Sequence, residues 1–269
     1  MAGSGAPSGP STRTWREVDD LVVRTLGLGT PGLGEAVRES AGAGLPPAHV
    51  PPALGQLLRL LCRVRGARRV LEVGTLGGVG ALWLARALPP GGRVVTLEID
   101  PDRAAVARRT LDRAGFAEAV EVRVGPAEAS LQALAAERAD PFDLVFIDAD
   151  RPGAATYLRL ALFLSQPGTV VVCDNVVRAG TVLDPVTPDA RGARALLQAL
   201  ADEPDLDATV IQTVGAKGHD GFALAVVGGP PRSGVAPARS PTHESGPSRL
   251  NPTHQSERPP TPCVPPSSP

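Results

Sequence analysis

The sequence predicts an α/β protein with a mostly parallel sheet and helices on both faces of that sheet. From residue 69 onward, short apolar runs alternate with segments of helical spacing, which is typical of successive βαβ units. Runs such as Val70–Val73 and Leu144–Ile147 are almost entirely apolar, as expected of strands buried on both faces. The 269 residues, 42% of them apolar and 20% charged, are enough for one large hydrophobic core.

Helices are expected before the first strand. Trp15, Val18 and Leu21 recur at helical spacing within residues 15–43, and an apolar stripe runs along residues 53–64. The alternating elements then follow in the order strand Val70–Val73, helix Gly80–Leu88, strand Val94–Ile99, helix Asp102–Ala114, strand Val120–Val124, helix Ala127–Ala139, strand Leu144–Ile147, helix Ala155–Leu164, strand Thr169–Cys173, helix Ala190–Ala201, strand Thr209–Gln212 and strand Phe222–Val227.

The two ends of the chain differ in composition from this central region. Residues 230–269 mix proline with Ser, Thr and His, and residues 1–14 are rich in Gly, Ser and Pro. Neither end can bury enough apolar surface to offset the entropy lost on ordering. We therefore expect two disordered tails around a single domain at residues 15–229.

Composition argues against several classes of protein. The chain has 27 basic and 28 acidic residues, so a surface that tracks nucleic-acid phosphates is not indicated. No window approaches the roughly 18 consecutive apolar residues of a membrane span, and no apolar signal segment opens the chain. Cys62, Cys173 and Cys263 are odd in number and widely spaced, which favours reduced thiols and a cytoplasmic location.

Ligands of open parallel sheets bind beyond the carboxyl ends of the strands, so the residues that follow each strand are the candidates. The first strand runs into VLEVGTLGGVG at residues 70–80, where Glu72 precedes several glycines. The run is not the G-x-G-x-x-G of a dinucleotide fold, and the Glu72 carboxylate favours an amino-bearing ligand over a pyrophosphate. A tight strand-to-helix turn is the alternative explanation for any single glycine.

The second strand ends in two acidic residues with different expected roles. Glu98 stands where an acid can accept hydrogen bonds from both hydroxyls of a ribose. Asp100 precedes Pro101 and is expected to cap the next helix. We assign Glu98 to ribose.

Further oxygen-bearing side chains follow the fourth and fifth strands. Asp148 and Asp150 end FIDAD, and Asp174 and Asn175 end VVVCDN, so all four converge at one edge of the sheet. Oxygen ligands from Asp148, Asp174 and Asn175 suit a hard divalent cation such as Mg²⁺. Two helix N-caps are the alternative, but two such pairs on neighbouring strands favour the metal.

As a set, five segments resemble the cation-dependent class I O-methyltransferases, the family that includes catechol and caffeoyl-coenzyme A O-methyltransferases. The resemblance covers Trp15–Val227. It implies a Rossmann-like methyltransferase fold with seven strands, the last of them antiparallel, and S-adenosylmethionine as the cofactor. The segments are LEVGTLGGVGALWLA at 71–85, VVTLEIDPDRA at 94–104, FIDAD at 146–150, CDNVVRAG at 173–180 and VGAKGHDGFALA at 214–225.

The resemblance also implies roles for particular residues. Cofactor contacts are carried over to Val50, Glu72, Gly74, Gly78, Gly80, Glu98, Ala127 and Asp148. The divalent cation, Mg²⁺ by preference, is assigned to Asp148, Asp174 and Asn175. Catalysis is assigned to Asp148 and Arg151, and acceptor contacts to Asp150, His219 and Asp220. In this family the metal chelates two vicinal oxygens of the acceptor and aims the ionised hydroxyl at the methyl sulfonium.

The sequence departs from the family pattern in three places. Arg151 stands where many relatives have lysine, and an arginine remains protonated, so we expect deprotonation of the acceptor to rest mainly on the metal. Arg151 is then expected to be an electrostatic partner of the acceptor oxygen or of Asp150. Gly80 replaces a common serine, and residues 152–154 replace a more polar stretch. Lys217, the chain's only lysine, is an alternative base, although a structural loop residue is the stronger interpretation.

The leading hypothesis is therefore methyl transfer from S-adenosylmethionine to a hydroxyl of a small catechol-like or hydroxylated aromatic acceptor. One alternative keeps the chemistry but takes a tRNA hydroxyuridine as acceptor, which the acidic balance of residues 15–229 disfavours. Another is a catalytically degenerate protein that binds the cofactor or a partner. A homodimer paired through residues 15–43 is expected from the resemblance, with neither a nucleic-acid nor a membrane partner.

Overall fold

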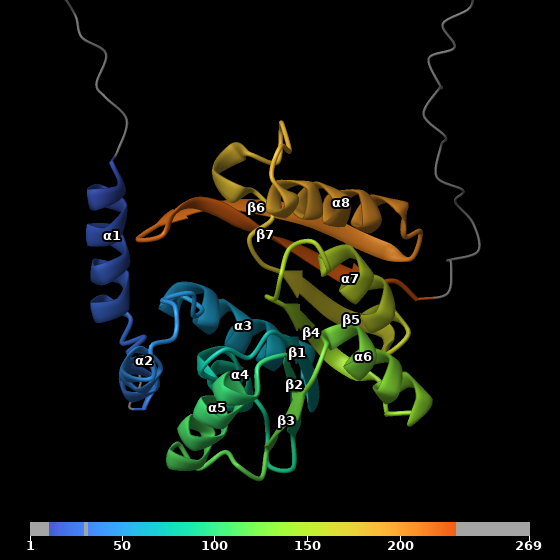
Figure 1. Cartoon of the computed structure of the whole chain (residues 1–269), viewed down its shortest axis with the longest axis horizontal. Coiled ribbons are helices and arrows are strands. Elements are labelled where there is room, and N and C mark those ends of the chain that lie inside the picture. Colours follow the sequence, from blue (N-terminus) through green and yellow to red (C-terminus); the bar gives the residue numbers. More distant parts are fainter. Residues whose placement is uncertain (1–10, 30–31, 230–269) are drawn as a thin grey trace, which may run out of the picture. The chain divides into compact units, whose positions relative to one another are not determined.

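The computed structural model describes residues 11–29 and 32–229. Seven strands form one sheet in the order β3-β2-β1-β4-β5-β7-β6, which confirms the predicted α/β fold (Figure 1). The strands are β1 Arg69–Val73, β2 Arg93–Glu98, β3 Val120–Val124, β4 Phe142–Ile147, β5 Ser165–Cys173, β6 Leu206–Gly215 and β7 Gly218–Val227. The helices are α1 Thr12–Thr25, α2 Leu33–Gly42, α3 Pro52–Arg65, α4 Val79–Ala85, α5 Pro101–Arg113, α6 Ala127–Ala136, α7 Ala154–Leu162, the 3-10 helix η1 Arg178–Gly180, and α8 Pro188–Asp202.

The strand order places four strand ends next to one another. β1 to β5 run parallel, whereas β7 is antiparallel to both β5 and β6. The register aligns Val73 with Leu97 and with Ile147, and it aligns Ile147 with Cys173. The residues that follow these positions therefore emerge side by side. The order also reverses between β1 and β4, where open α/β sheets leave a crevice for ligands.

Helices cover both faces of the sheet through two buried apolar clusters. The first joins α3, α4 and α5 to one face and contains Leu58 and Trp83. The second joins α6, α7 and α8 to the other face and contains Leu131, Leu158 and Leu196. In the described part of the chain, none of the helices has the length and apolar character needed to cross a membrane.

The N-terminal region differs from the single helical stretch expected at residues 15–43. α1 begins at Thr12, where the side chain of Ser11 accepts a hydrogen bond from the backbone of Thr14, and it ends at Thr25. A glycine-rich segment with Gly27 and Gly32 at positive φ separates it from α2. The helix thus starts within the predicted N-terminal tail, while residues 1–10 and the predicted tail at 230–269 lie outside the described residues.

The last two strands are longer than predicted. β6 pairs with β7 from Leu206–Val227 to Gly215–Gly218, whereas the sequence pattern indicated a strand only at Thr209–Gln212. β6 is an edge strand and is largely exposed, so only part of it has the apolar character of a buried strand. The tip of this hairpin is held by α1, because the backbone N–H of Ala216 donates to Asp19 Oδ2 at 2.7 Å.

A close helix contact gives the first testable prediction. A Cβ added at Gly55 of α3 would lie 2.3 Å from Nε1 of the buried Trp83 in α4. We expect Gly55→Ala to lower the free energy of unfolding by about 1–3 kcal/mol, because overpacking outweighs the roughly 0.5–1 kcal/mol that alanine contributes within a helix. Urea unfolding followed by circular dichroism measures this difference.

The matched control is Gly42→Ala in α2. A Cβ at Gly42 meets no atom within 4 Å, so this variant is expected to be neutral or slightly stabilising. Equal losses of stability in the two variants would contradict the steric argument.

Candidate active site

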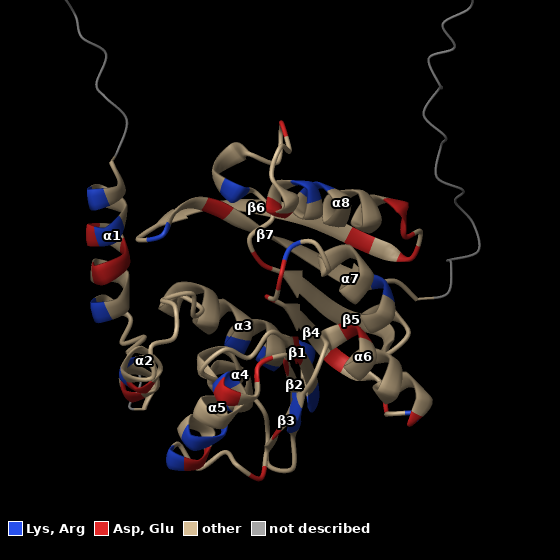
Figure 2. Cartoon of the chain, in the orientation of Figure 1, with Lys and Arg blue, Asp and Glu red and all other residues tan. Residues whose placement is uncertain are grey.

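A cleft of about 530 Å³ opens beyond the carboxyl ends of β1, β2, β4 and β5. Figure 2 shows acidic and basic residues next to one another in the loops between the sheet and α7. Most of the residues predicted for the cofactor and the metal line this cleft. They are Val50, Glu72, Gly74, Gly80, Glu98, Ala127, Asp148 and Asn175, with Asp150 and Arg151 beside them.

The glycine loop follows β1 and fits closely against the end of β4. Gly74 has a φ of +103°, and a Cβ there would lie 2.2 Å from the carbonyl oxygen of Asp148. Gly78 caps α4 with a φ of +84°, and it lies against α5 at Ala107 rather than in the cleft lining. Glycine is therefore required at position 74 both by the backbone conformation and by the space available.

Glu72 is a buried carboxyl group at the floor of the cleft. It is 1% exposed and accepts a hydrogen bond of 2.6 Å from Thr96 Oγ1, which is itself 2.6 Å from Thr75 Oγ1. Burial, helped by the carboxylates of Asp148 and Glu98, raises the pKa of Glu72 to about 8, although the hydrogen bond from Thr96 lowers it. A ligand ammonium group at this position would favour the ionised form.

Gly80 keeps the space beside Glu72 open. A Cβ at position 80 would lie 2.1 Å from Glu72 Oε1 and 3.5 Å from a methyl group of Val50. The glycine that departs from the family pattern therefore leaves space beside two residues predicted to hold the cofactor. Val50, in turn, is 5% exposed at the cleft wall.

Glu98 ends β2 and is 4% exposed. Its Oε2 accepts the backbone N–H of Leu76 at 2.7 Å, and its Oε1 accepts that of Asp100 at 3.1 Å. Each carboxylate oxygen retains a lone pair for a further donor such as a ribose hydroxyl. Asp100 caps α5, as predicted, by accepting from the backbone of Asp102 and Arg103.

Asp148 and Asp174 form a pair of carboxylates at the ends of β4 and β5. Asp174 is 8% exposed. Burial, together with the neighbouring charges of Asp148 and Asp220, raises the pKa of Asp174 to about 7. The N–H of Asn175 and the guanidinium of Arg151 oppose it. Close carboxylates of this kind are stabilised by additional positive charge.

The ligands predicted for a cation are these two aspartates and Asn175. Asn175 has a φ of +58°, which is unusual for a residue other than glycine. Residues 11–29 and 32–229 contain no group of three His, Cys, Asp or Glu side chains that could hold a metal ion. The predicted ligand set contains only two such residues, Asp148 and Asp174, and its third ligand is the amide oxygen of Asn175. Two carboxylates and an amide are nonetheless the hard oxygen ligands that Mg²⁺ accepts.

Arg151 bridges the pair of strand ends and is 7% exposed, and its ion pair is with Asp148. One terminal nitrogen donates to Asp148 Oδ1 at 2.9 Å, and the other donates to the carbonyl oxygen of Asp174 at 2.6 Å. A Cβ at Gly192 of α8 would lie 2.3 Å from the carbonyl oxygen of Arg151, so α8 fixes the backbone of this residue. Arg151 therefore supplies fixed positive charge between the two aspartates.

The three residues predicted to contact the acceptor lie in different places. Asp150 lines the cleft and accepts hydrogen bonds from Tyr157 Oη at 2.6 Å and from the N–H of Gly153 at 2.9 Å. His219 lies in the β6–β7 hairpin, 2.9 Å from Gln212 Oε1, and is not part of the cleft lining. Its role as an acceptor contact stays a prediction without support from this cleft.

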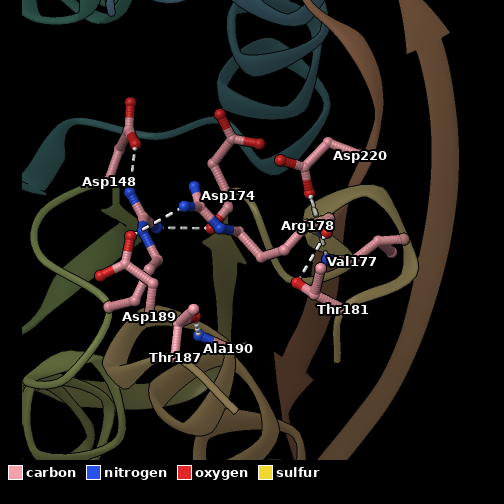
Figure 3. Close-up of polar contacts among 10 residues, drawn as sticks. Asp148, Asp174, Val177, Arg178, Thr181, Thr187, Asp189, Ala190 and Asp220 are labelled. Atoms are coloured by element: carbon pink, nitrogen blue, oxygen red, sulfur yellow. Dashed lines mark hydrogen bonds and ion pairs between the residues drawn. The ribbon is translucent and has the colours of Figure 1, made fainter. Parts of the chain in front are cut away.

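Asp220 is also outside the cleft lining and anchors a loop. Its Oδ1 accepts the backbone N–H groups of Val177, Arg178 and Gly221 at 3.1, 2.8 and 2.9 Å. This network holds the segment that follows Asn175 (Figure 3). The geometry thus gives Asp220 a structural task, while the acceptor contact stays a prediction.

Several residues of the cleft lining were not predicted from the sequence. Tyr157, Arg103, Arg178 and Asp189 all line the cleft. Arg178 lies within the CDNVVRAG segment, so attention to that motif could have found it. Asp189 lies in the first turn of α8, far from any recognised motif, and only the packing of α8 brings it to the site.

Lys217 lies at the tip of the β6–β7 hairpin, outside the cleft lining, and its ammonium donates to the carbonyl oxygen of His49. Burial lowers the pKa of Lys217, although the carboxylates of Asp148 and Asp174 act in the opposite direction. This contact agrees with a structural role. Cys173 and Trp83 are buried in the core, as expected.

The seven-stranded fold and its cleft define a Rossmann-like methyltransferase architecture, and comparison with known proteins agrees. A family model described as O-methyltransferase matches residues 30–226. The chain is 50% identical over 212 residues to a catechol O-methyltransferase of Mycobacterium tuberculosis, covering 78% of this chain and 95% of that protein. It is 44% identical over 219 residues to a catechol O-methyltransferase of Niastella koreensis, covering 81% and 99%.

A solved structure is similar over the same region. The O-methyltransferase of Bacillus cereus in complex with SAH is 46% identical, with a TM-score of 0.79 over 81% of this chain and all of that one. The chain belongs to the O-methyltransferase family and is an enzyme of the S-adenosylmethionine-dependent class. This confirms the family and the class of enzyme that the sequence predicted.

Glu72 generates a prediction on pH and stability. Its pKa is about 8 in the folded protein and takes the ordinary value of 4.5 when the chain unfolds. Between these values the folded state retains a proton that the unfolded state has lost, so the free energy of unfolding should fall as pH rises from about 4.5 to about 8. Urea unfolding at several pH values, without cofactor, should show a smaller fall in Glu72→Gln.

The exposed residue Glu118 provides the control, and Glu118→Gln is expected to keep the wild-type pH dependence. If Glu72→Gln also keeps that dependence, another group is responsible for it.

Proposed function

We propose that the chain transfers the methyl group of S-adenosylmethionine to a hydroxyl of a small catechol-like acceptor, with a divalent cation, Mg²⁺ by preference, as second cofactor. The observation that carries the proposal is the pair of aspartates at the ends of β4 and β5: Asp148 lines the same cleft as Glu72, and Asp174 is buried close enough to Asp148 for the two charges to interact. One half of the cleft suits an ammonium-bearing cofactor and the other suits a hard cation.

The cofactor half is supported by the carboxyl groups of Glu72 and Glu98 and by the glycine loop between them. Glu72 is positioned to accept hydrogen bonds from the cofactor's amino group, and Glu98 from its ribose hydroxyls. Val50 and Ala127 supply apolar contacts at the cleft wall. The B. cereus relative, which is in complex with SAH, supports the same cofactor for this chain.

The metal half is supported by the donor chemistry of Asp148, Asp174 and Asn175. A bound divalent cation would stabilise the ionised acceptor hydroxyl next to the methyl donor. Arg151 orients the Asp148 carboxylate and offsets the repulsion between the two aspartates. Because its guanidinium remains protonated, Arg151 is not the base that removes the acceptor's proton.

The names of the relatives favour a catechol over a tRNA nucleoside as acceptor. The cleft lining agrees, because the carboxylates of Glu98, Asp148 and Asp150 would repel a phosphate backbone. No observation on the described residues favours a nucleic-acid partner.

We also propose that the enzyme works in the cytoplasm as a homodimer. The described cysteines, Cys62 and Cys173, are both free and buried, as suits a reducing compartment. Val18 and Leu21 of α1 and Val214 of β6 are each more than half exposed, which leaves apolar surface for a second copy of the chain.

Sedimentation velocity should give a dimer for the full chain and a shift toward monomer in Leu21→Asp. A monomeric wild type would refute this part of the proposal.

The principal test measures cofactor binding and turnover separately. S-adenosylhomocysteine, the product of S-adenosylmethionine after methyl transfer, is titrated calorimetrically into the full chain, and catechol methylation is followed with Mg²⁺ or with a chelator. We expect Asp174→Asn to retain cofactor binding but to lower kcat/KM at least about 100-fold, because several kcal/mol of charge stabilisation depend on the cation. Mg²⁺ should restore the activity lost on chelation.

Asp184→Asn is the matched control, because Asp184 is exposed and lies outside the cleft. It should behave as wild type. Activity that persists in the chelator and in Asp174→Asn would refute the metal, and failure to bind S-adenosylhomocysteine would refute the cofactor site.

A further inference from the structure

Arg178 is a charged cleft residue that the proposed methyl transfer does not use. It lies three positions after Asn175 and begins the short 3-10 helix η1, which follows β5. Figure 3 shows its side chain extending past Asp174 toward Asp189 of α8, where a terminal nitrogen donates to Asp189 Oδ2 at 2.7 Å. The guanidinium therefore forms part of the wall on the proposed metal and acceptor side of the cleft.

The fold holds the backbone of Arg178 in an uncommon conformation. Arg178 and Ala179 have φ values of +56° and +53°, in the left-handed region that is unfavourable for residues other than glycine. Asp220 of β7 offsets this cost by accepting the N–H groups of Val177 and Arg178. Strained positions of this kind gather at ligand sites, because the surrounding structure fixes where the side chain begins.

The ion pair with Asp189 leaves the guanidinium available to a ligand. The side chains of Arg178 and Asp189 are 34% and 50% exposed, and a pair so exposed contributes little to stability. Only one of the five N–H donors of Arg178 is engaged within the described residues. Asp189 lies in the first turn of α8, so the helix dipole would still stabilise its charge when Arg178 leaves the ion pair to bind a ligand.

The other arginines of the cleft are differently placed. Arg151 is buried and committed to Asp148 and to the carbonyl oxygen of Asp174. Arg103 belongs to α5, next to the proposed ribose site, and pairs with Asp100 at 3.6 Å. Of the arginines that line the cleft in the described residues, Arg178 is thus the one that lies near Asn175 and has N–H groups available for a ligand.

We propose that Arg178 determines acceptor specificity by binding a carboxylate substituent of the acceptor in place of Asp189, so that the preferred substrate is a carboxylated catechol rather than catechol itself. The planar guanidinium matches a carboxylate through two parallel hydrogen bonds. The carboxylate of Asp150, which also lines the cleft, would repel an anion near it. Arg178 is therefore the favoured contact for the acceptor's carboxylate. This inference rests on the proposed function and narrows its substrate class.

The test compares two acceptors that differ in one carboxylate, catechol and 3,4-dihydroxybenzoate, using the full chain with S-adenosylmethionine and Mg²⁺. Wild type is expected to prefer 3,4-dihydroxybenzoate in kcat/KM. We expect Arg178→Met to reduce this preference about 10- to 100-fold, the range for losing a hydrogen-bonded charge pair, mainly through KM. Arg178→Lys should lose part of the preference, and Asp189→Asn should increase it because the competing carboxylate is gone.

Arg159→Met is the control, since Arg159 is exposed on α7 outside the cleft and its loss changes the net charge equally. It should retain the wild-type preference. A preference that is unchanged in Arg178→Met, or absent in wild type, would overturn the inference while leaving catechol methylation intact. An equal loss with both acceptors in Arg178→Met and Arg178→Lys would show a structural role and would also overturn it.

If wild type methylates neither acceptor, the proposed function fails. The binding of the carboxylated acceptor is then measured without turnover. Calorimetric titration of 3,4-dihydroxybenzoate in the presence of S-adenosylhomocysteine should then show binding to wild type that is about 10-fold weaker or more in Arg178→Met. Equal binding to both proteins would overturn the inference.

Discussion

The site is organised around Arg151, whose guanidinium lies between the carboxylate of Asp148 and the carbonyl oxygen of Asp174. Parallel pairing of β4 and β5 brings the two aspartates together, because Ile147 and Cys173 are in register immediately before them. Burial and mutual repulsion raise the pKa of Asp174, so this arrangement would be unfavourable without a cation beside it. The buried arginine supplies that charge from within the chain.

The position of Arg151 depends in turn on elements from distant parts of the sequence. Gly192 lets α8 approach the backbone of Arg151, and Gly74 lets the loop after β1 approach the carbonyl of Asp148. In both places the backbones are so close that a single Cβ would overlap an oxygen atom. The cofactor side and the proposed metal side of the cleft are therefore linked through the same strand end.

A second set of contacts fixes the loop after β5. Asp220, on the antiparallel strand β7, holds the amides of Val177 and Arg178, which places Arg178 in the cleft wall. Asp220, which was predicted to contact the acceptor, thus fixes the loop that carries Arg178. The insertion of β7 between β5 and β6 is what brings this carboxylate to the loop.

Much of the fold and part of the site could be predicted from local patterns. Apolar runs and helical spacing located the strands and helices, because burial on both faces of a sheet imposes a continuous apolar run. Residues in the last positions of strands, such as Glu72 and Glu98, or directly after a strand, such as Asp148, could be assigned to the cleft because parallel strands end at one edge. The extent of β6 could not, since an exposed edge strand lacks that apolar signature.

The sequence by itself determined the class of the fold, the family and the strand-end residues that line the cleft, because these depend on short-range pattern and on position along a strand. Only the tertiary structure decided which charges meet. The pairing of Arg178 with Asp189, the bridge made by Arg151, and the anchoring role of Asp220 join residues from different strands and helices. Such contacts depend on register and helix packing, and one sequence read from end to end carries no local signal for them.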